Sequence, residues 1–296
     1  MLKHDKVALE EKLVKSGEVS IHVLVGGEGI PLILLHGWPG FWKDWERVIP
    51  LVVDNCKVVV PDLRGFGLSD KPRRPEDYTL EHYSADVEAI MNALGLRTAF
   101  LAGFDVGSIV AAFFASRNPN SVAGLILMNP SYPGLGRKRL ELPYAAENWY
   151  QLFHLTDLAE ALVGYNRDTV KIYLSHFYER WSYRKSAFNE QDVEEYVDVY
   201  FKHGLFGGFN WYRARFQTRY GDWLGGGVEA STLVIWSDRD PIFPLEWSGD
   251  VKKFFRNSEV VHINDCGHFI PREAPEVTAE HIKRFLSKQQ RLNKSV

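Results

Sequence analysis

The chain has 296 residues, of which 45% are hydrophobic and 25% charged, and its formal net charge is −3. These proportions are ordinary for a globular protein and exclude a disordered chain, and the near-neutral charge gives no sign of a nucleic-acid-binding surface. The two cysteines, Cys56 and Cys266, are too few for a disulfide framework.

Short apolar runs alternate with helical patterns along the chain. Residues 1–16 lack the apolar core of a signal peptide, and no apolar run is long enough to cross a membrane, so we expect a cytoplasmic protein. Helical patterns span Leu80–Leu94 and Val106–Ser116. Most candidate strands are continuously apolar, which is typical of parallel strands buried on both faces. The candidate strands are Val19–Val25, Leu32–Leu35, Lys57–Val60, Ala99–Leu101, Gly124–Met128, Thr232–Trp236 and Glu259–Ile263.

The alternation predicts an α/β fold with a mostly parallel, doubly wound sheet. Between residues 131 and 227 the alternation stops, and aromatic and charged residues follow with helical spacing. We expect three parts: a first core part (1–130), a helical cap (131–227) and a second core part (228–296). A cap at this place would cover the sheet edge where open α/β folds bind ligands. The polar tail, Leu286–Val296, is expected to fray.

The segment Gly103-Phe104-Asp105-Val106-Gly107 follows an apolar strand and precedes a helical pattern. This context is typical of the nucleophile elbow of α/β-hydrolases, with aspartate where most such enzymes have serine. The bare pattern is weak, because aspartate after glycine is commonly a turn former or a helix N-cap. A carboxylate nucleophile attacks a saturated carbon that bears a leaving group and forms an alkyl ester. Ser108 is not expected to replace the missing serine, because it would face the helix packing.

An acid and a histidine that would complete a catalytic triad occur in the order expected of α/β-hydrolases. Asp240 follows the Thr232–Trp236 strand and precedes Pro241, and His268 follows the last strand. Asp238 and Asp265 also lie at strand ends, where either could be a cap or a partner of Arg239 or Arg272. Asp240 is favoured over Asp238 because Pro241 fixes a turn directly after it. An isolated histidine is more often a surface or core residue, but its place at a strand end favours catalysis.

The segment Leu34-Leu35-His36-Gly37-Trp38-Pro39-Gly40 also follows a strand. Its loop would place the Trp38 amide near the nucleophile, and with the Val106 amide it would form an oxyanion hole. His36 is predicted to be structural. The segment 62–70, DLRGFGLSD, is predicted to tie its loop to the core and is assigned no chemistry.

Taken together, HGWPG, DLRGFGLSD, GFDVGS, SDRDPIFP and DCGHFIPREAPE resemble the α/β-hydrolase-fold epoxide hydrolases and the related haloalkane dehalogenases. The resemblance runs from about Gly17 to Lys288 and implies a helical cap inserted after the sixth strand. It also implies that Tyr212, in an N-W-Y-R segment, points its hydroxyl into the site. Tyr150, in WYQLF, resembles the second cap tyrosine, although Tyr144 lies close by.

The resemblance implies hydrolysis of a small apolar epoxide by water, with no metal or organic cofactor. Asp105, Asp240, His268, Tyr150 and Tyr212 would be catalytic. The residues expected to contact the substrate are Trp38, Phe104, Tyr150 and Tyr212.

Three alternatives are weaker. A haloalkane dehalogenase would resemble this chain but carry tryptophan at the position of Val106 and asparagine at that of Trp38. A fluoroacetate-type dehalogenase would need arginines just past the nucleophile, and Ile109–Ser116 contains none. A non-catalytic small-molecule-binding protein on this fold would have lost a member of the triad, and all three members are present.

Overall fold

The computed structural model describes residues 2–4, 7–217 and 223–293. Its strands form one sheet in the order β1-β2-β3-β5-β4-β6-β7-β8-β9. The strands from β5 to β9 in this order pair in parallel, and β1, β2 and β3 form an antiparallel extension at one edge. The strands are β1 (Leu2–His4), β2 (Val7–Ser16), β3 (Val19–Gly26), β4 (Ile30–Leu35), β5 (Cys56–Pro61), β6 (Ala99–Phe104), β7 (Val122–Met128), β8 (Thr232–Ser237) and β9 (Ser258–Ile263).

All seven predicted strands are present, but β1 and β2 were not predicted. The reason lies in the pattern of β2, VALEEKLVKS, in which exposed charged residues alternate with a few buried apolar ones. An antiparallel strand near a sheet edge needs to bury only one face, so it lacks the continuous apolar run that marks the central strands.

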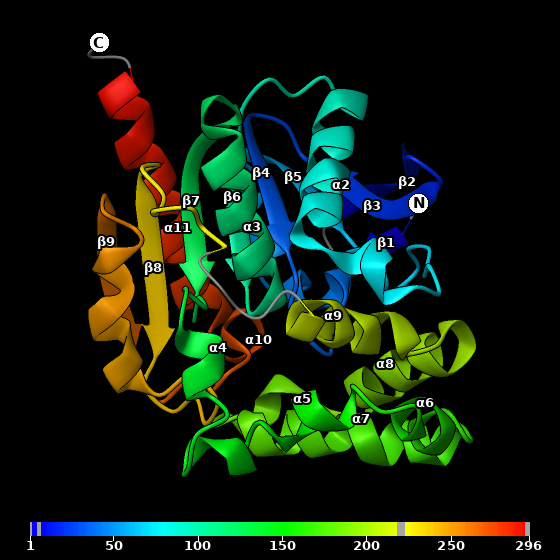
Figure 1. Cartoon of the computed structure of the whole chain (residues 1–296). Coiled ribbons are helices and arrows are strands. Elements are labelled where there is room, and N and C mark those ends of the chain that lie inside the picture. Colours follow the sequence, from blue (N-terminus) through cyan, green and yellow to red (C-terminus); the bar gives the residue numbers. More distant parts are fainter. Residues whose placement is uncertain (1, 5–6, 218–222, 294–296) are drawn as a thin grey trace.

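Helices cover both faces of the sheet (Figure 1). The pair α2 and α3 packs on one face, and the pair α1 and α11 packs on the other. The helices of this core are α1 (Ile49–Val52), α2 (Leu80–Ala93), α3 (Val106–Arg117), α10 (Ile270–Glu273) and α11 (Pro275–Asn293). Short 3₁₀ helices are η1 (Trp42–Trp45), η2 (Pro75–Tyr78), η3 (Pro119–Ser121), η4 (Tyr144–Ala146), η5 (Lys185–Ala187) and η6 (Leu245–Lys253).

A helical segment is inserted between β7 and β8. Its helices lie beyond the carboxyl ends of the parallel strands, below the sheet in Figure 1. The insertion follows the sixth strand when strands are counted from β2, as expected, although residues 218–222 of the predicted cap lie outside the described residues. The helices are α4 (Leu135–Lys138), α5 (Trp149–Phe153), α6 (Leu158–Val163), α7 (Arg167–Trp181), α8 (Glu190–His203) and α9 (Phe206–Gln217).

The prediction that the tail frays from Leu286 onward is wrong over most of its length. Helix α11 continues to Asn293, and Phe285, Leu286 and Gln289 are buried. Leu286, next to Phe285, packs on the core, and the polar composition of the rest of the segment concealed this anchor. Residues 294–296 of that tail lie outside the described residues.

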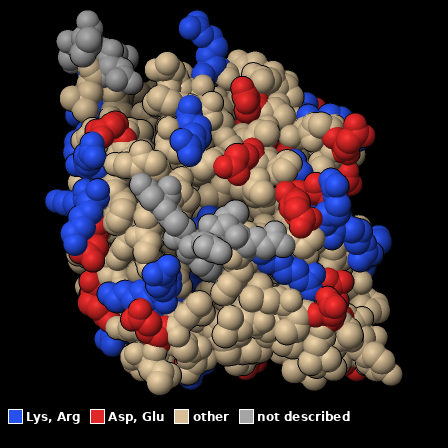
Figure 2. Space-filling model, viewed as in Figure 1, with Lys and Arg blue, Asp and Glu red and all other residues tan. Residues whose placement is uncertain are grey.

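The described surface carries both signs of charge. On the face shown in Figure 2, acidic and basic side chains are interspersed. Both cysteines are free and buried. No helix within the described ranges combines the length and apolarity needed to cross a membrane.

Candidate active site

Asp105 occupies a sharp turn between β6 and α3. Its backbone has φ 50° and ψ −113°, a strained conformation for a residue with a side chain. The neighbouring glycines are needed because other backbone segments lie against them. A Cβ on Gly103 would lie 2.3 Å from the Gly107 oxygen, and one on Gly107 would lie 2.2 Å from the Leu35 oxygen. The strained turn thus lifts the Asp105 side chain to the carboxyl end of the sheet.

The Asp105 carboxylate is held by the loop after β4. The Trp38 amide donates a hydrogen bond of 2.8 Å to Asp105 Oδ1. The Val106 amide, at the first position of α3, makes no hydrogen bond with this carboxylate in the described structure. Ser108 is buried and its hydroxyl donates to the Asp105 backbone oxygen at 2.6 Å, so it braces the turn. His36 is likewise structural, since its Nε2 accepts from the Leu63 amide at 2.9 Å.

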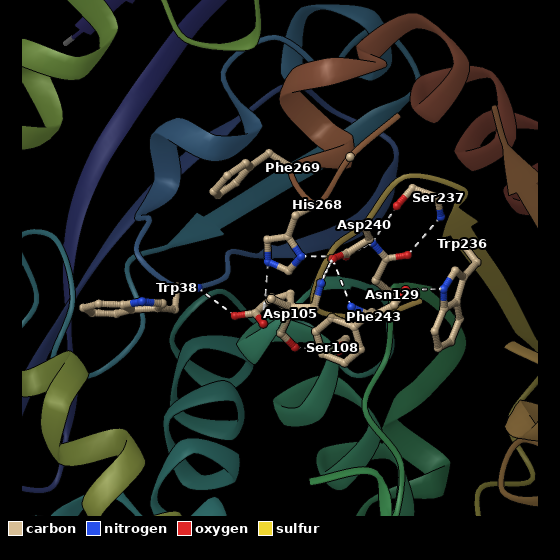
Figure 3. Close-up of polar contacts among 12 residues, drawn as sticks. Trp38, Asp105, Ser108, Asn129, Trp236, Ser237, Asp240, Phe243, His268 and Phe269 are labelled. Atoms are coloured by element: carbon tan, nitrogen blue, oxygen red, sulfur yellow. Dashed lines mark hydrogen bonds and ion pairs between the residues drawn. The ribbon is translucent and has the colours of Figure 1, made fainter. Parts of the chain in front are cut away.

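His268 lies between the two aspartates (Figure 3). Its Nδ1 lies 2.7 Å from Asp240 Oδ2, and its Nε2 lies 3.8 Å from Asp105 Oδ2. The imidazole is fully buried, which lowers its pKa, but the charges of Asp240 and Asp105 outweigh burial and raise the pKa above its ordinary value. The arrangement leaves Nε2 directed to the Asp105 side.

The Asp240 carboxylate is fixed by hydrogen bonds on both oxygens. The amides of Ile242 and Phe243 donate to Oδ1 at 2.8 and 3.0 Å, and Asn129 Nδ2 donates to Oδ2 at 2.6 Å. Asp238, the alternative acid, points elsewhere: it accepts from the Cys266 amide at 3.3 Å and pairs with Arg239. The structure therefore brings Asp240, and not Asp238, to the histidine.

Asn129 was not anticipated from the sequence. It directly follows β7 and has a φ of 43°, and its side chain also bonds Ser237, accepting from the amide and donating to the hydroxyl. No motif marks it, although its position directly after a parallel strand, like that of Asp105, was a usable signal.

The two predicted cap tyrosines lie side by side and face Asp105. Tyr150 from α5 and Tyr212 from α9 are buried, and their ring centroids lie 5.5 Å apart at an angle of 88°. Burial raises the pKa of both hydroxyls, and the negative charge of Asp105 raises each of them further, as expected when they face the carboxylate. Tyr144, the neighbouring alternative, instead donates to Glu246 at 3.1 Å.

The aromatic residues predicted to contact substrate surround these groups. The Trp38 ring packs edge-on against Tyr212, with centroids 5.9 Å apart. Phe104 is buried in β6, and its ring lies 5.1 Å from the His268 ring, so it supports the imidazole from below. A substrate contact of Phe104 stays a prediction.

Three buried tyrosines of the insertion donate to the loop that carries the Trp38 amide. Tyr178 from α7 donates to the Pro39 oxygen at 2.9 Å, and Tyr200 from α8 donates to the Gly40 oxygen at 2.5 Å. Tyr196, also from α8, donates to Asp44 Oδ1 at 2.6 Å. The insertion thus holds the amide that contacts Asp105.

The histidine loop is tied to the insertion through Glu273. Its carboxylate accepts from the amides of Gly267 and Phe269 on either side of His268, and from those of Tyr183 and Arg184 after α7. All four bonds are 2.9 to 3.0 Å. The sequence marked this residue only as part of the DCGHFIPREAPE segment.

The described residues contain no group of three or more histidine, cysteine, aspartate or glutamate side chains arranged to hold a metal ion. The site brings together a carboxylate, an imidazole with its acid, two phenols and a backbone donor.

Strand ends that carry a nucleophile, an acid and a histidine in this order define the α/β hydrolase class. The chain belongs to the alpha/beta hydrolase fold family, which it matches over residues 30–275. It is similar to a soluble epoxide hydrolase of Corynebacterium sp. (strain C12), with 30% identity over 283 residues that cover 90% of this chain and 93% of the relative.

Two further similarities point the same way. Epoxide hydrolase 1 of Caenorhabditis elegans is 27% identical over 290 residues, which cover 95% of this chain and 71% of the relative. The crystal structure of epoxide hydrolase VrEH1 from Vigna radiata superposes with a TM-score of 0.81 at 27% identity, and covers 95% of this chain and 98% of its own.

Proposed function

We propose that the protein hydrolyses epoxides to vicinal diols through an ester formed on Asp105. One observation carries the proposal: the Asp105 carboxylate lies between the Trp38 amide at 2.8 Å and the His268 imidazole at 3.8 Å, beneath two buried tyrosines. This set has a nucleophile, a base and two acids for an oxygen leaving group.

The first half-reaction opens the ring. Asp105 Oδ2 attacks a ring carbon, and the carbon–oxygen bond of the epoxide breaks with its electron pair on the ring oxygen. Tyr150 and Tyr212 donate hydrogen bonds to that oxygen, and one of them supplies the proton. The product of this step is a hydroxyalkyl ester of Asp105.

The second half-reaction cleaves the ester. His268 takes a proton from water, whose oxygen attacks the ester carbonyl carbon, while the Trp38 amide stabilises the oxyanion. The protonated His268 then gives its proton to the departing diol oxygen. Esterification removes the negative charge of Asp105, and with it one of the interactions that raise the pKa of His268. The loss of this interaction favours the neutral imidazole, which is the form that acts as a base.

The relatives named epoxide hydrolase support this reaction over the alternatives. A dehalogenase has to stabilise a halide, for which indole N–H donors suit better than phenols, and Val106 at the position after the nucleophile offers none. The substrate class that fits the aromatic surroundings is a small apolar epoxide.

A single turnover with styrene oxide in ¹⁸O-labelled water tests the mechanism. We expect the label in the Asp105 carboxylate, read by mass spectrometry of the peptide that carries it, and unlabelled oxygen in the first diol. Diol formation without label in Asp105 would mean direct attack by water on the epoxide. If styrene oxide is not turned over, 1,2-dibromoethane tests the dehalogenase alternative.

A further inference from the structure

A buried polar network surrounds the hydroxyl of Tyr150. Arg139 Nη2 lies 3.2 Å from the Tyr150 oxygen, and Gln151 Nε2 lies 3.4 Å from it. Both groups also bond Asn148 Oδ1, each at 2.9 Å. Arg139 is 7% exposed, Gln151 2% and Asn148 not at all. These side chains are therefore buried and joined to one another by hydrogen bonds.

The Tyr144 carbonyl and the Arg139 guanidinium decide which groups of this network donate hydrogen bonds and which accept them. Asn148 Nδ2 bonds the Tyr144 carbonyl at 3.0 Å, and a carbonyl accepts only. Asn148 therefore turns its Oδ1 to Arg139, whose guanidinium donates only. The same Oδ1 requires Gln151 to present its amide nitrogen, which has two hydrogens: one for Asn148 and one for the Tyr150 oxygen.

A tyrosine hydroxyl has two lone pairs and one hydrogen. Arg139 and Gln151 both approach the Tyr150 oxygen as donors, so both lone pairs are engaged. The single hydrogen of the hydroxyl therefore has to point away from both donors. The network thus decides which way the O–H bond points.

We propose that Arg139 and Gln151 are positioning residues that make Tyr150 the proton donor to the opening epoxide oxygen. The inference rests on the proposed function. As the Asp105 oxygen–carbon bond forms and the epoxide carbon–oxygen bond breaks, the ring oxygen takes the proton of Tyr150. The two N–H donors then stabilise the phenolate, and the proton returns from the Asp105 carboxyl group released in the second half-reaction.

The pKa shifts of the two tyrosines also favour Tyr150 as the proton donor. Burial raises the pKa of Tyr150, and the Arg139 charge opposes the rise more directly than at Tyr212. The pKa of Tyr212 lies well above the ordinary value, chiefly through burial. Tyr212 is then the partner that holds the ring oxygen without losing its proton.

The test is a double-mutant cycle on single-turnover rates with styrene oxide, followed by rapid quench and mass spectrometry of the ester. We expect Tyr150→Phe to slow ester formation about 100-fold and Arg139→Met about tenfold. In the double variant the Arg139 change should cost nothing further, because it acts through the hydroxyl that is gone. Ester hydrolysis should stay within about twofold of wild type in all three.

Three further variants sharpen the result. Gln151→Met should slow ester formation in the same way without removing a buried cation, so the test does not depend on Arg139→Met folding. Arg139→Lys should restore part of the rate. Arg137→Met, an exposed arginine on the same helix, is the matched control and should leave both half-reactions unchanged.

The proposal would be overturned if the two rate reductions multiplied in the double variant. It would also be overturned if Arg139→Met slowed ester formation and ester hydrolysis equally, because Arg139 would then only stabilise the fold. Normal ester formation in both Arg139→Met and Gln151→Met would also overturn it, while leaving the proposed function intact. A wild-type protein that forms diol without an ester would overturn both.

Discussion

The side-chain amide of Asn129 donates a 2.6 Å hydrogen bond to Asp240 Oδ2, the same oxygen that binds His268 Nδ1 at 2.7 Å. Two donors from different strand ends therefore converge on one carboxylate oxygen. Since Oδ1 is occupied by backbone amides, Asp240 has no freedom to turn away from the histidine. The acid is held in a single orientation before any substrate arrives.

Asn129→Ala should lower the free energy of unfolding by about 2 to 3 kcal/mol, because it leaves the buried Ser237 amide without a partner, removes one of the two donors to Asp240 Oδ2 and keeps a positive φ without a suitable side chain. Asn129→Gly loses the same hydrogen bonds but tolerates the backbone, so its loss should be smaller. Urea unfolding measures both. Equal stabilities of the two variants would argue that the backbone conformation contributes nothing.

His268→Gln should form the ester of Asp105 and fail to cleave it. The variant keeps a side chain of similar length but has no base for water, so a protein mass increased by one substrate molecule should accumulate with styrene oxide. The control is Asp105→Ala combined with His268→Gln, which should show no adduct. A His268→Gln variant that turns over normally would remove His268 from the mechanism.

Tyr150→Phe and Tyr212→Phe should each slow ester formation about 100-fold, because the ring oxygen loses a donor as its charge develops. Tyr132→Phe is the control: its buried hydroxyl donates to the Trp247 oxygen at 2.8 Å, so it should lose about 1 kcal/mol of stability and no activity. Rapid-quench kinetics measures the first effect and thermal unfolding the second. Unchanged rates in both tyrosine variants would argue against a phenolic acid.

The sequence predicted the parts of this molecule that repeat a local pattern. The central strands are recognisable in the sequence as apolar runs. Asp105, Asp240 and His268 each follow one of these runs. The parts it did not predict depend on pairing partners far along the chain. Strand β2, next to the edge of the sheet, is defined by its antiparallel pairing with β3, and Asn129 and Arg139 carry no motif. Their roles depend on hydrogen bonds to residues that only the folded chain brings close.

Gly107→Ala should abolish the elbow geometry. The added methyl group would lie 2.2 Å from the Leu35 oxygen and 2.6 Å from the His36 oxygen, both backbone atoms, so either the elbow or the loop after β4 has to move. We expect a loss of about 2 to 4 kcal/mol and of ester formation. Gly249→Ala is the matched control, since nothing lies within 4 Å of its Cβ, and it should be neutral. A stable, active Gly107→Ala variant would contradict the close approach.

Asp44 makes the stability of the protein depend on pH. It is fully buried beneath the loop that carries the Trp38 amide, and its Oδ2 has no hydrogen-bond partner among the described residues. Burial raises the pKa of its carboxyl group to about 7, against the hydrogen bond from Tyr196 and the charge of Arg272. The folded state then holds a proton that the unfolded state releases near pH 4, so stability falls as pH rises between these values.

Asp44→Asn should remove that loss, because the amide stays neutral at every pH. Relative to wild type, the variant should gain up to about 4 kcal/mol between pH 4 and pH 8. Urea unfolding at a series of pH values measures the difference, and Asp54→Asn, at an exposed aspartate, controls for the general effect of removing a charge. Parallel stability curves for Asp44→Asn and wild type would mean that Asp44 is ionised in the folded protein. The Tyr196 and Arg272 contacts would then outweigh burial, and the loop after β4 would rest on a buried anion.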